Sequence, residues 1–454
     1  MKRKLLCWIL VLSLLLCACQ TTAKTDIDPS GQVSAGELDT TPTPTGEVPF
    51  TQTDSFPVPF DGELHVAAGE VCLTADEALY DYDTMWLLLE ENYPYLDRIE
   101  AELGINWREI RDNYRKQLDK KGYVSQASFI DVINLCLYDL HNVGHMFVLF
   151  PSTWQRYGDS WLTIEDDLLQ RMGNLIQNPR SKQFYRYWEK LIINTASGLS
   201  ATMSVVDNDA ISPGITFGVV DDIPYVKIST FSGWTDDTYA AMSQFLTGVQ
   251  DKDHLIIDIQ GNAGGDIRPW MSMIAALIDE PIANEMFFAA KSGPLNLALN
   301  PQFADSIGEV YTDDSWREDF PYIQPEYVED MDLLFKVTQR IQPSDTEHTF
   351  DGKVWVLVDD VCYSSADQFA VFCQGTGFAT LVGTETSGNG IGAQPYVMAL
   401  PYSGLVIYYE PYLTFNPDGS CNGIRGTQPD LTPEEGQSAL DTCLAAIHAE
   451  ETNK

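Results

Sequence analysis

The sequence predicts an α/β core that follows a mostly helical N-terminal domain. From about residue 78 to 200, apolar residues recur every three or four positions, which is typical of amphipathic helices. From about residue 215, short apolar strands alternate with helical segments, which is typical of a sheet covered by helices. We therefore expect the helical domain at 71–210 and the α/β core at 211–454.

In the helical domain the clearest periodicity lies in four segments. They are residues 86–96, 107–118, 129–140 and 184–192. In the core, the expected strands are 224–230, 254–259, 354–359, 379–384 and 405–410, and the expected helices are 239–249, 270–278 and about 364–374. The strand at 254–259 is almost entirely apolar, as expected where both faces of a sheet are covered. Residues 280–350 are interpreted as an irregular elaboration, apart from a helix at 326–341.

The charge of the chain excludes one large class of function. The 454 residues include 27 Lys and Arg against 66 Asp and Glu, for a net charge of −39. A protein that binds nucleic acid needs cations to replace the counterions of the phosphates, so no nucleic-acid partner is expected. The same charge argues against a polybasic contact with anionic lipid.

The N-terminus has the pattern of an export signal. Basic residues at 2–4 precede an apolar run at 5–18, which is shorter than the roughly 20 residues needed to span a bilayer. The run ends in Leu-Cys-Ala-Cys, which resembles a bacterial lipobox. The resemblance implies a signal peptide at 1–19, lipidation of Cys19 and an extracytoplasmic location on a bacterial membrane. Ordinary signal cleavage without a lipid is the alternative. Residues 20–70 begin rich in Thr, Pro, Gly and Ser and are expected to form a flexible tether.

Beyond Cys19, the cysteines contain no Cys-x-x-Cys pair, so a zinc knuckle is not expected. These cysteines are Cys72, Cys136, Cys362, Cys373, Cys421 and Cys443. An exported protein can form disulfides, but their pairing is left open.

Three short segments carry residues suited to catalysis. Ser364 follows a buried strand and begins a helix, where N–H groups and the helix dipole stabilise negative charge. Alternatively, Ser364 and Asp367 form a helix-capping box. The loop after 254–259 contains Gly264 and Gly265, and such a loop either offers free N–H groups to a carbonyl or simply turns the chain.

The third segment contains His141 and His145. Two histidines four positions apart can bind a metal, but residue 142 is Asn and no acidic third ligand is evident. We therefore predict no metal and no other cofactor.

Taken together, five segments in order resemble the C-terminal processing, or tail-specific, serine peptidases, which include the tricorn core protease. The segments are NVGHMF (142–147), LIIDIQGNAGG (255–265), FDGKVWVLVDDVCYSSADQF (350–369), ATLVGTETSGNG (379–390) and NPDGSCNGIRGTQPDL (416–431). The resemblance implies a crotonase/Clp-protease-like α/β core. It also implies a nucleophile at Ser364, a general base at His145 and an acyl-enzyme. The backbone N–H groups of Gly264 or Gly265 and of Ser365 would form the oxyanion hole.

The sequence departs from the family at several positions. The family's alternative lysine base falls on Asn389, and the only lysine after Ser364 is Lys454, so the histidine-dependent, tricorn-like branch is expected. The Asp of the family's Asp-Gly-His element is Val143, and the Glu that supports the histidine falls on Gly423. We consider Glu410 as a substitute for that Glu. A PDZ module is not expected, because residues 150–215 are too few.

The leading hypothesis is a membrane-anchored extracytoplasmic serine endopeptidase that acts on a peptide or protein substrate. A degenerate, non-catalytic family member that binds a peptide or a partner is the alternative, and the losses at Val143 and Gly423 favour it. A solute-binding lipoprotein would explain the signal and the tether, but not the five ordered segments.

Overall fold

The structure is a computed structural model that describes residues 64–67, 70–119, 122–199, 214–301, 308–344 and 350–452. The expected signal peptide, with Cys19, and most of the expected tether lie outside the described residues. Strand β1 (His65–Ala67) already lies within the range expected as tether, and it pairs with β2 (Glu70–Thr74). Among the described residues, no helix is both long enough and apolar enough to cross a bilayer.

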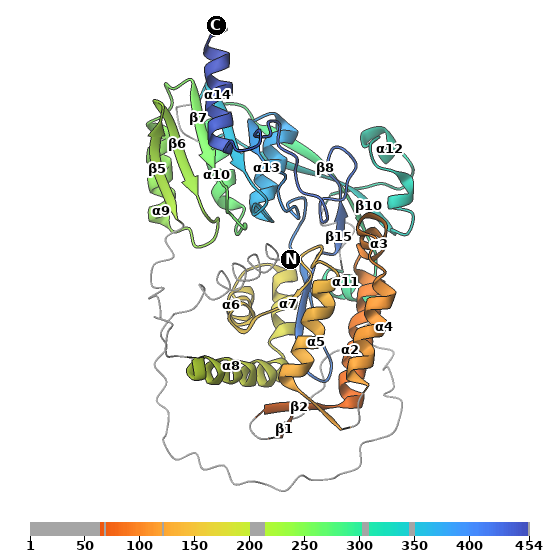
Figure 1. The fold of residues 1–454 in the computed structure, drawn as a ribbon. Coiled ribbons are helices and arrows are strands. Elements are labelled where there is room, and N and C mark those ends of the chain that lie inside the picture. The colour runs from red at the N-terminus through yellow and green to blue at the C-terminus, as the bar shows by residue number, and fades with distance from the viewer. Residues whose placement is uncertain are drawn as a thin grey trace.

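Seven helices of the described part form the N-terminal half, which lies below the sheet of the core in Figure 1. They are α2 (Ala75–Asn92), α3 (Leu96–Leu103), α4 (Trp107–Leu118), α5 (Gln126–Asp139), α6 (Pro151–Trp161), α7 (Asp167–Ile176) and α8 (Pro179–Leu199). They confirm the expected helices at 107–118, 129–140 and 184–192, whereas the segment expected at 86–96 is helical only to Asn92 and then turns before α3. Local capping interactions determine where several of these helices begin. Thr74 and Glu77 form a capping box for α2, and the Asn106 side chain caps α4. Between α4 and α5, β3 (Tyr123–Ser125) completes a small sheet with β1 and β2.

The core contains a five-stranded sheet in the order β12-β11-β7-β6-β5. Its strands are β5 (Ile215–Val220), β6 (Ile223–Ile228), β7 (His254–Asp258), β11 (Lys353–Val358) and β12 (Ala379–Gly383). They run parallel except β5, which pairs antiparallel with β6 at the edge. The α/β fold class and the expected strands of this sheet are confirmed.

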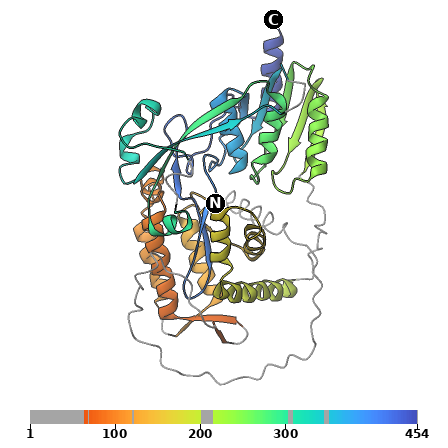
Figure 2. The same cartoon turned by 180° about the vertical axis from the view of Figure 1, so that it is seen from behind.

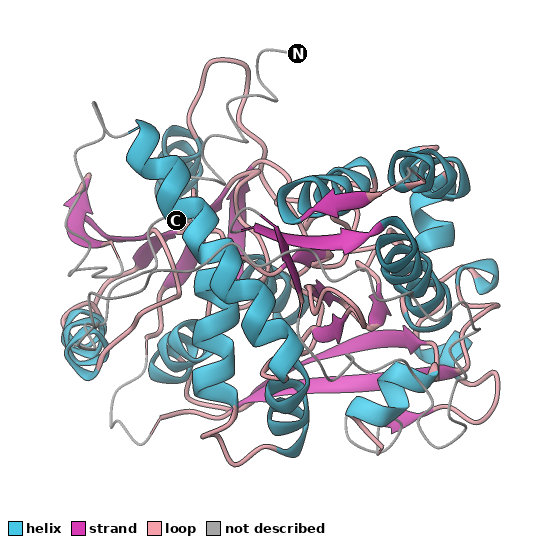
Figure 3. Ribbon diagram, turned by 90° about the horizontal axis from the view of Figure 1, so that it is seen from below, coloured by secondary structure: helices cyan, strands magenta, loops and turns pink. Residues whose placement is uncertain are grey.

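Helices cover both faces of this sheet, as the apolar strands predict. Leu255 and Ile257 point to the face that packs against α9 (Asp236–Thr247), α10 (Arg268–Leu277) and α13 (Ser365–Thr376). Ile256 points to the opposite face, against α14 (Ala439–Thr452). Figure 3 shows the helices in cyan and the strands in magenta. Because both faces are covered, the loops at the strand ends are where reactive side chains reach the surface.

The prediction of a helix at 326–341 is wrong. Residues Leu333–Ile341 form strand β10, which pairs antiparallel with β8 (Ile282–Ala290) over nine residues. Cross-strand pairing with β8 and burial of Phe335 outweigh the local helical pattern. This second sheet has the order β15-β8-β10-β9, with β9 at Glu309–Val310 and β15 at Tyr412–Thr414. Short helices also lie here: α11 (Pro294–Leu299), α12 (Trp316–Asp319) and η1 (Pro325–Tyr327).

A hairpin from the C-terminal part of the chain lies inside the helical half. Its strands, β13 (Tyr396–Ala399) and β14 (Val406–Tyr409), form a sheet with β4 (Phe147–Val148). Figures 1 and 2 show the hairpin, in blue, among the helices. One apolar cluster joins residues of α2 and α5 to residues of the hairpin. The ranges 71–210 and 211–454 therefore follow chain order and are not separate packing units.

The turn of this hairpin is held by a buried carboxyl group. Asp81 of α2 is fully buried, and its two oxygens accept the N–H groups of Tyr402 and Ser403, each at 2.7 Å. Burial is the main influence on the Asp81 carboxyl group, and it raises the pKa of this group to about 7. Asp81 therefore fastens the C-terminal hairpin to the first long helix.

We expect Asp81→Ala to lower the free energy of unfolding by about 2–4 kcal/mol, because two buried N–H groups lose this acceptor. The measurement is urea unfolding at pH 8, where the carboxyl group is ionised. Asp83→Ala is the matched control, since Asp83 lies on the same helix in an exposed pair with Arg115 and should cost about 1 kcal/mol or less. Equal losses in the two variants would contradict the anchoring role of Asp81.

Candidate active site

The structure brings together two side chains that lie 219 positions apart in the sequence. His145 follows α5 in the helical half, and Ser364 immediately precedes α13 in the core. The His145 Nε2 and Ser364 Oγ atoms lie 3.0 Å apart, which is a hydrogen-bond distance. A serine hydroxyl at this distance from an imidazole nitrogen can donate its hydrogen to that nitrogen. This is the arrangement found for an activated serine nucleophile.

Ser364 has an unusual backbone conformation. Its φ is 56° and its ψ is −125°, a sparsely populated combination for a residue with a side chain. Its N–H donates to Gly388 O at 3.0 Å, and its side chain makes no capping bond to α13. The capping-box alternative is therefore wrong. Instead, the sharp turn between β11 and α13 directs the hydroxyl to His145, as in a nucleophile elbow.

Asp367, the other member of the expected capping box, has a different role. It is fully buried and accepts hydrogen bonds from the 386–427 segment. Its donors are Thr386 Oγ1, Gly390 N, Asn422 Nδ2, Thr427 N and Thr427 Oγ1. These bonds fix the first turn of α13, and with it Ser364, against the C-terminal loops.

The glycine loop after β7 lies directly against Ser364. A Cβ atom on Gly264 would lie 2.6 Å from Tyr363 O and 3.0 Å from Ser365 N, so only glycine fits there. The Gly264 N–H donates to Asn262 Oδ1 at 2.8 Å and is not available to a substrate. The N–H groups of Gly265 and Ser365 have no acceptor among the described residues. Of the expected oxyanion-hole donors, the geometry thus favours Gly265 and Ser365 over Gly264.

The side chains of Ser365 and Trp270, to which the sequence alone assigns no role, hold this loop in place. Ser365 Oγ donates to Asp266 O at 2.9 Å, and Trp270 Nε1 donates to Ser365 Oγ at 3.2 Å. The side chain of Ser365 therefore ties the glycine loop to the helix that carries its own N–H group. No local pattern distinguishes such a serine, because its partners come from a distant loop and from α10.

His145 lies in a tight turn that its neighbours enforce. It has a φ of 54° and is only 8% exposed. The Tyr93 hydroxyl donates to Val143 O at 2.6 Å, and the Tyr363 ring lies 5.1 Å from the imidazole. Burial lowers the pKa of His145 to about 4. The imidazole is therefore neutral at physiological pH, which is the state that can accept a proton.

The neighbouring His141 is exposed and does not join the site. The described residues contain no group of three or more His, Cys, Asp or Glu side chains that could hold a metal ion. Cys136, Cys362, Cys373, Cys421 and Cys443 are buried free thiols, and Cys72 is buried as well.

A buried acid lies on the other side of His145. Glu410 follows β14 and is 2% exposed, and its Oε2 atom lies 3.7 Å from His145 Nδ1. Burial raises the pKa of Glu410 well above its usual range. Asn389, at the position where the sequence resemblance implies the alternative lysine base, directs its amide nitrogen to Gly423 O at 3.5 Å.

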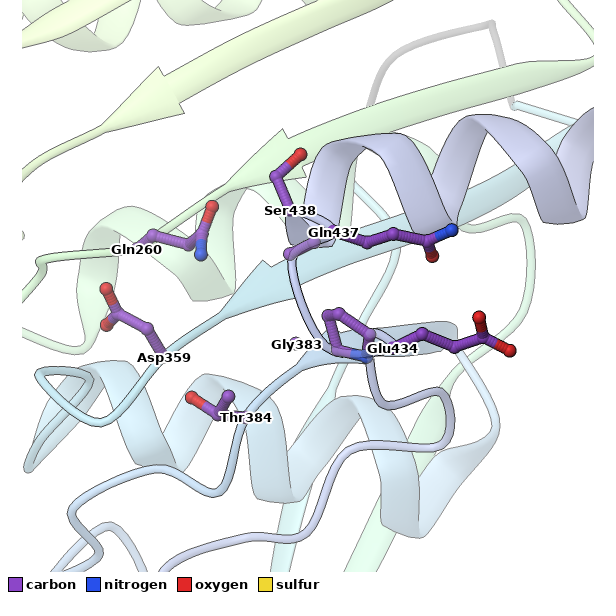
Figure 4. Close-up of a pocket in the computed structure, with 9 residues that line it drawn as sticks. Gln260, Asp359, Gly383, Thr384, Glu434, Gln437 and Ser438 are labelled. Carbon is purple, nitrogen blue, oxygen red and sulfur yellow. The ribbon is translucent and has the colours of Figure 1, made fainter.

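A surface hollow lies elsewhere on the core, near the ends of β7 and β11 and the start of α14 (Figure 4). It is lined by Gln260, Asp359, Gly383, Thr384, Pro433, Glu434, Gln437, Ser438 and Ala439. Neither Ser364 nor His145 lines it, so it is not the site described above.

We expect the His145 imidazole to titrate with a midpoint near pH 4, because burial disfavours the charged form. This pKa lies below the value of about 6.5 in an unfolded chain. The neutral His145 imidazole therefore leaves the folded state at its full stability above pH 6.5. Part of that stability is lost as the pH falls toward 4, because the unfolded chain takes up the proton first. Nitrogen NMR of the imidazole from pH 3.5 to 8 measures the midpoint. A midpoint at or above 6.5 would contradict the burial of this side chain.

Comparison with known proteins supports the family resemblance. Residues 222–432 match the model described as peptidase family S41, a range that includes Ser364 and Glu410 but not His145. No curated protein matches the chain.

Solved structures support the fold over most of the chain. A candidate peptidase from Parabacteroides merdae is 15% identical with a TM-score of 0.50, and the match covers 83% of this chain and 96% of that one. Mature CPAF complexed with lactacystin is 13% identical with a TM-score of 0.51, over 83% of this chain and 97% of that one. Mature CPAF alone is 14% identical with a TM-score of 0.50, over 81% and 94%. At these identities the similarity concerns the fold, while the family model identifies the catalytic class. The chain thus contains a peptidase family S41 domain at residues 222–432, which makes it a serine peptidase.

Proposed function

We propose that this peptidase is an endopeptidase that works through an acyl-enzyme, with Ser364 as nucleophile and His145 as general base. The observation that supports this most strongly is the 3.0 Å contact between Ser364 Oγ and His145 Nε2. The conformation of Ser364 and its place at the start of α13 fit the same role.

The reaction follows from this geometry. His145 Nε2 accepts the proton of Ser364 as its Oγ attacks the carbonyl carbon of the scissile peptide bond. The oxygen that becomes negative accepts hydrogen bonds from the Gly265 and Ser365 N–H groups. His145 then gives the proton to the leaving amine, which departs and leaves an ester on Ser364. A water molecule, deprotonated by His145, hydrolyses the ester and restores the free serine.

The proposal extends to the location of the protein. The signal-like residues 1–18 and Cys19 support a lipid-anchored protein on the outer side of a bacterial membrane. The long segment between Cys19 and β1 would let the catalytic half reach substrates away from the membrane surface.

We expect a fluorophosphonate probe to label the purified protein at Ser364 alone, as mapped by mass spectrometry. Ser364→Ala should remove the labelling, and His145→Ala should slow it by at least about 10⁴-fold, because the hydroxyl loses its base. Ser160→Ala, which alters a helical serine of α6, is the control and should label at the normal rate. A well-folded protein that does not label would instead support the non-catalytic, partner-binding alternative.

We expect Cys19 to carry the lipid when the full chain is produced in bacteria. A clickable palmitate analogue should enter the wild-type protein and sediment with the membranes, whereas Cys19→Ser should do neither. Incorporation that survives Cys19→Ser would contradict the proposed anchor site.

A further inference from the structure

We propose that Glu410 is the acid that orients His145 in this chain, in place of the glutamate that the family resemblance implies at the position of Gly423. This inference rests on the proposed function of Ser364 and His145. Glu410 acts through His145 and is therefore a positioning residue.

Backbone pairing brings Glu410 to His145. Strand β14 runs antiparallel to β4, with Tyr408 opposite Phe147. Beyond this pair, the Glu410 N–H donates to Gly144 O at 2.6 Å. This bond fixes Glu410 beside the turn that carries His145, so the proximity of the two side chains follows from the sheet.

His145 and Glu410 are each available as a hydrogen-bond partner for the other. His145 Nδ1 and Glu410 Oε1 are both buried, and neither has a hydrogen-bond partner in the described part of the structure. An unpaired buried polar atom is costly, and an Nδ1–H donated to the carboxylate would satisfy the imidazole. The 3.7 Å between Nδ1 and Oε2 is slightly longer than a hydrogen bond, and such contacts often tighten when substrate binds. With the proton held on Nδ1, Nε2 is free to accept the proton of Ser364.

Gly392 provides the room for this carboxyl group. A Cβ atom on Gly392 would lie 3.2 Å from Glu410 Oε2, closer than most side-chain contacts. The backbone N–H groups of Tyr412 and Ala393 favour the ionised form of the carboxyl group. A side chain at position 392 would therefore press on the carboxyl group where it faces His145.

The place of the family's glutamate is filled by another residue. A Cβ atom on Gly423 would lie 2.3 Å from a ring carbon of Tyr95. The Tyr95 ring is fully buried, and its hydroxyl donates to Tyr412 O at 2.6 Å. A glutamate at 423 therefore cannot fit while Tyr95 is present. The loss at Gly423 and the buried Glu410 are consistent with a relocated acid.

The groups around Glu410 are almost all tyrosines. Its charge affects Tyr93, Tyr95, Tyr363, Tyr396, Tyr408, Tyr409 and Tyr412, in addition to its contact with His145. Among the described residues, no Lys or Arg forms an ion pair with Glu410. The ionised carboxyl group thus has His145 as its cationic partner, and this partner becomes charged when it accepts the proton of Ser364. The reactivity of Ser364 should rise as the pH rises through the raised pKa of Glu410.

The test compares Glu410→Gln with the wild type in the full-length protein, using the rate of fluorophosphonate labelling from pH 5 to 9. The Gln variant keeps the shape but loses the charge, and it should label at least about a hundredfold more slowly at pH 8. It should also lose the rise of rate with pH. Glu410→Asp keeps a carboxyl group and should keep that rise, at an intermediate rate. Glu102→Gln is the matched control, since Glu102 Oε1 is likewise buried without a partner, and it should behave as the wild type.

A second readout separates this inference from the proposed function. Nitrogen NMR at pH 8 should find the His145 proton on Nδ1 in the wild type and displaced from it in Glu410→Gln. Failure of the wild type to label would contradict the role of Ser364, and the NMR comparison would still decide the role of Glu410. A Gln variant with unchanged tautomer, or one that labels more slowly with an unchanged pH profile, would overturn the inference. If the Gln variant does not fold, the Asp variant decides, because a labelling rate equal to that of the wild type there would also overturn the inference.

Discussion

The pairing of β14 with β4 is the contact on which the site depends. Strand β4 directly follows the turn of His145, and strand β14 ends one residue before Glu410. The hairpin that contains β14 belongs to the C-terminal part of the chain, yet it packs in the apolar core of the helical half. Because the hairpin is held there by Asp81, the histidine of one half is fixed relative to the serine of the other.

In the proposed reaction, burial favours proton transfer to His145 and also sets a requirement. It keeps His145 neutral, so that the imidazole can accept the proton of Ser364. The same burial disfavours the imidazolium that forms next, and a nearby negative charge is needed to stabilise it. In the mechanism that we propose, the carboxyl group of Glu410 supplies this charge, and its Oε2 atom lies 3.7 Å from His145 Nδ1.

Much of the fold could be predicted because its signals are local. The apolar strands at 254–259 and 354–359 and the periodic helices depend on burial patterns that the sequence shows directly. Strand β10 could not be predicted, because its pairing with β8 joins residues far apart in the chain. Ser364 and His145 were found through family-like segments, and the structure adds their 3.0 Å contact.

The remaining parts of the site depend on tertiary contacts that no short pattern shows. Glu410 follows an ordinary buried strand, and only the pairing with β4 brings it near His145. The Gly264 amide looks available in the sequence, but the Asn262 side chain accepts its hydrogen. The hydrogen bond from Ser365 Oγ to Asp266 O likewise joins the start of α13 to a loop that lies about a hundred residues earlier in the chain.

The most direct test of the central claim is a crystal structure of the protein after reaction with a fluorophosphonate. We expect phosphorus bonded to Ser364 Oγ, its oxygen within hydrogen-bond distance of the Gly265 and Ser365 N–H groups, and Glu410 bonded to His145 Nδ1. Phosphorus on another residue, or an adduct whose oxygen faces away from those N–H groups, would contradict the account.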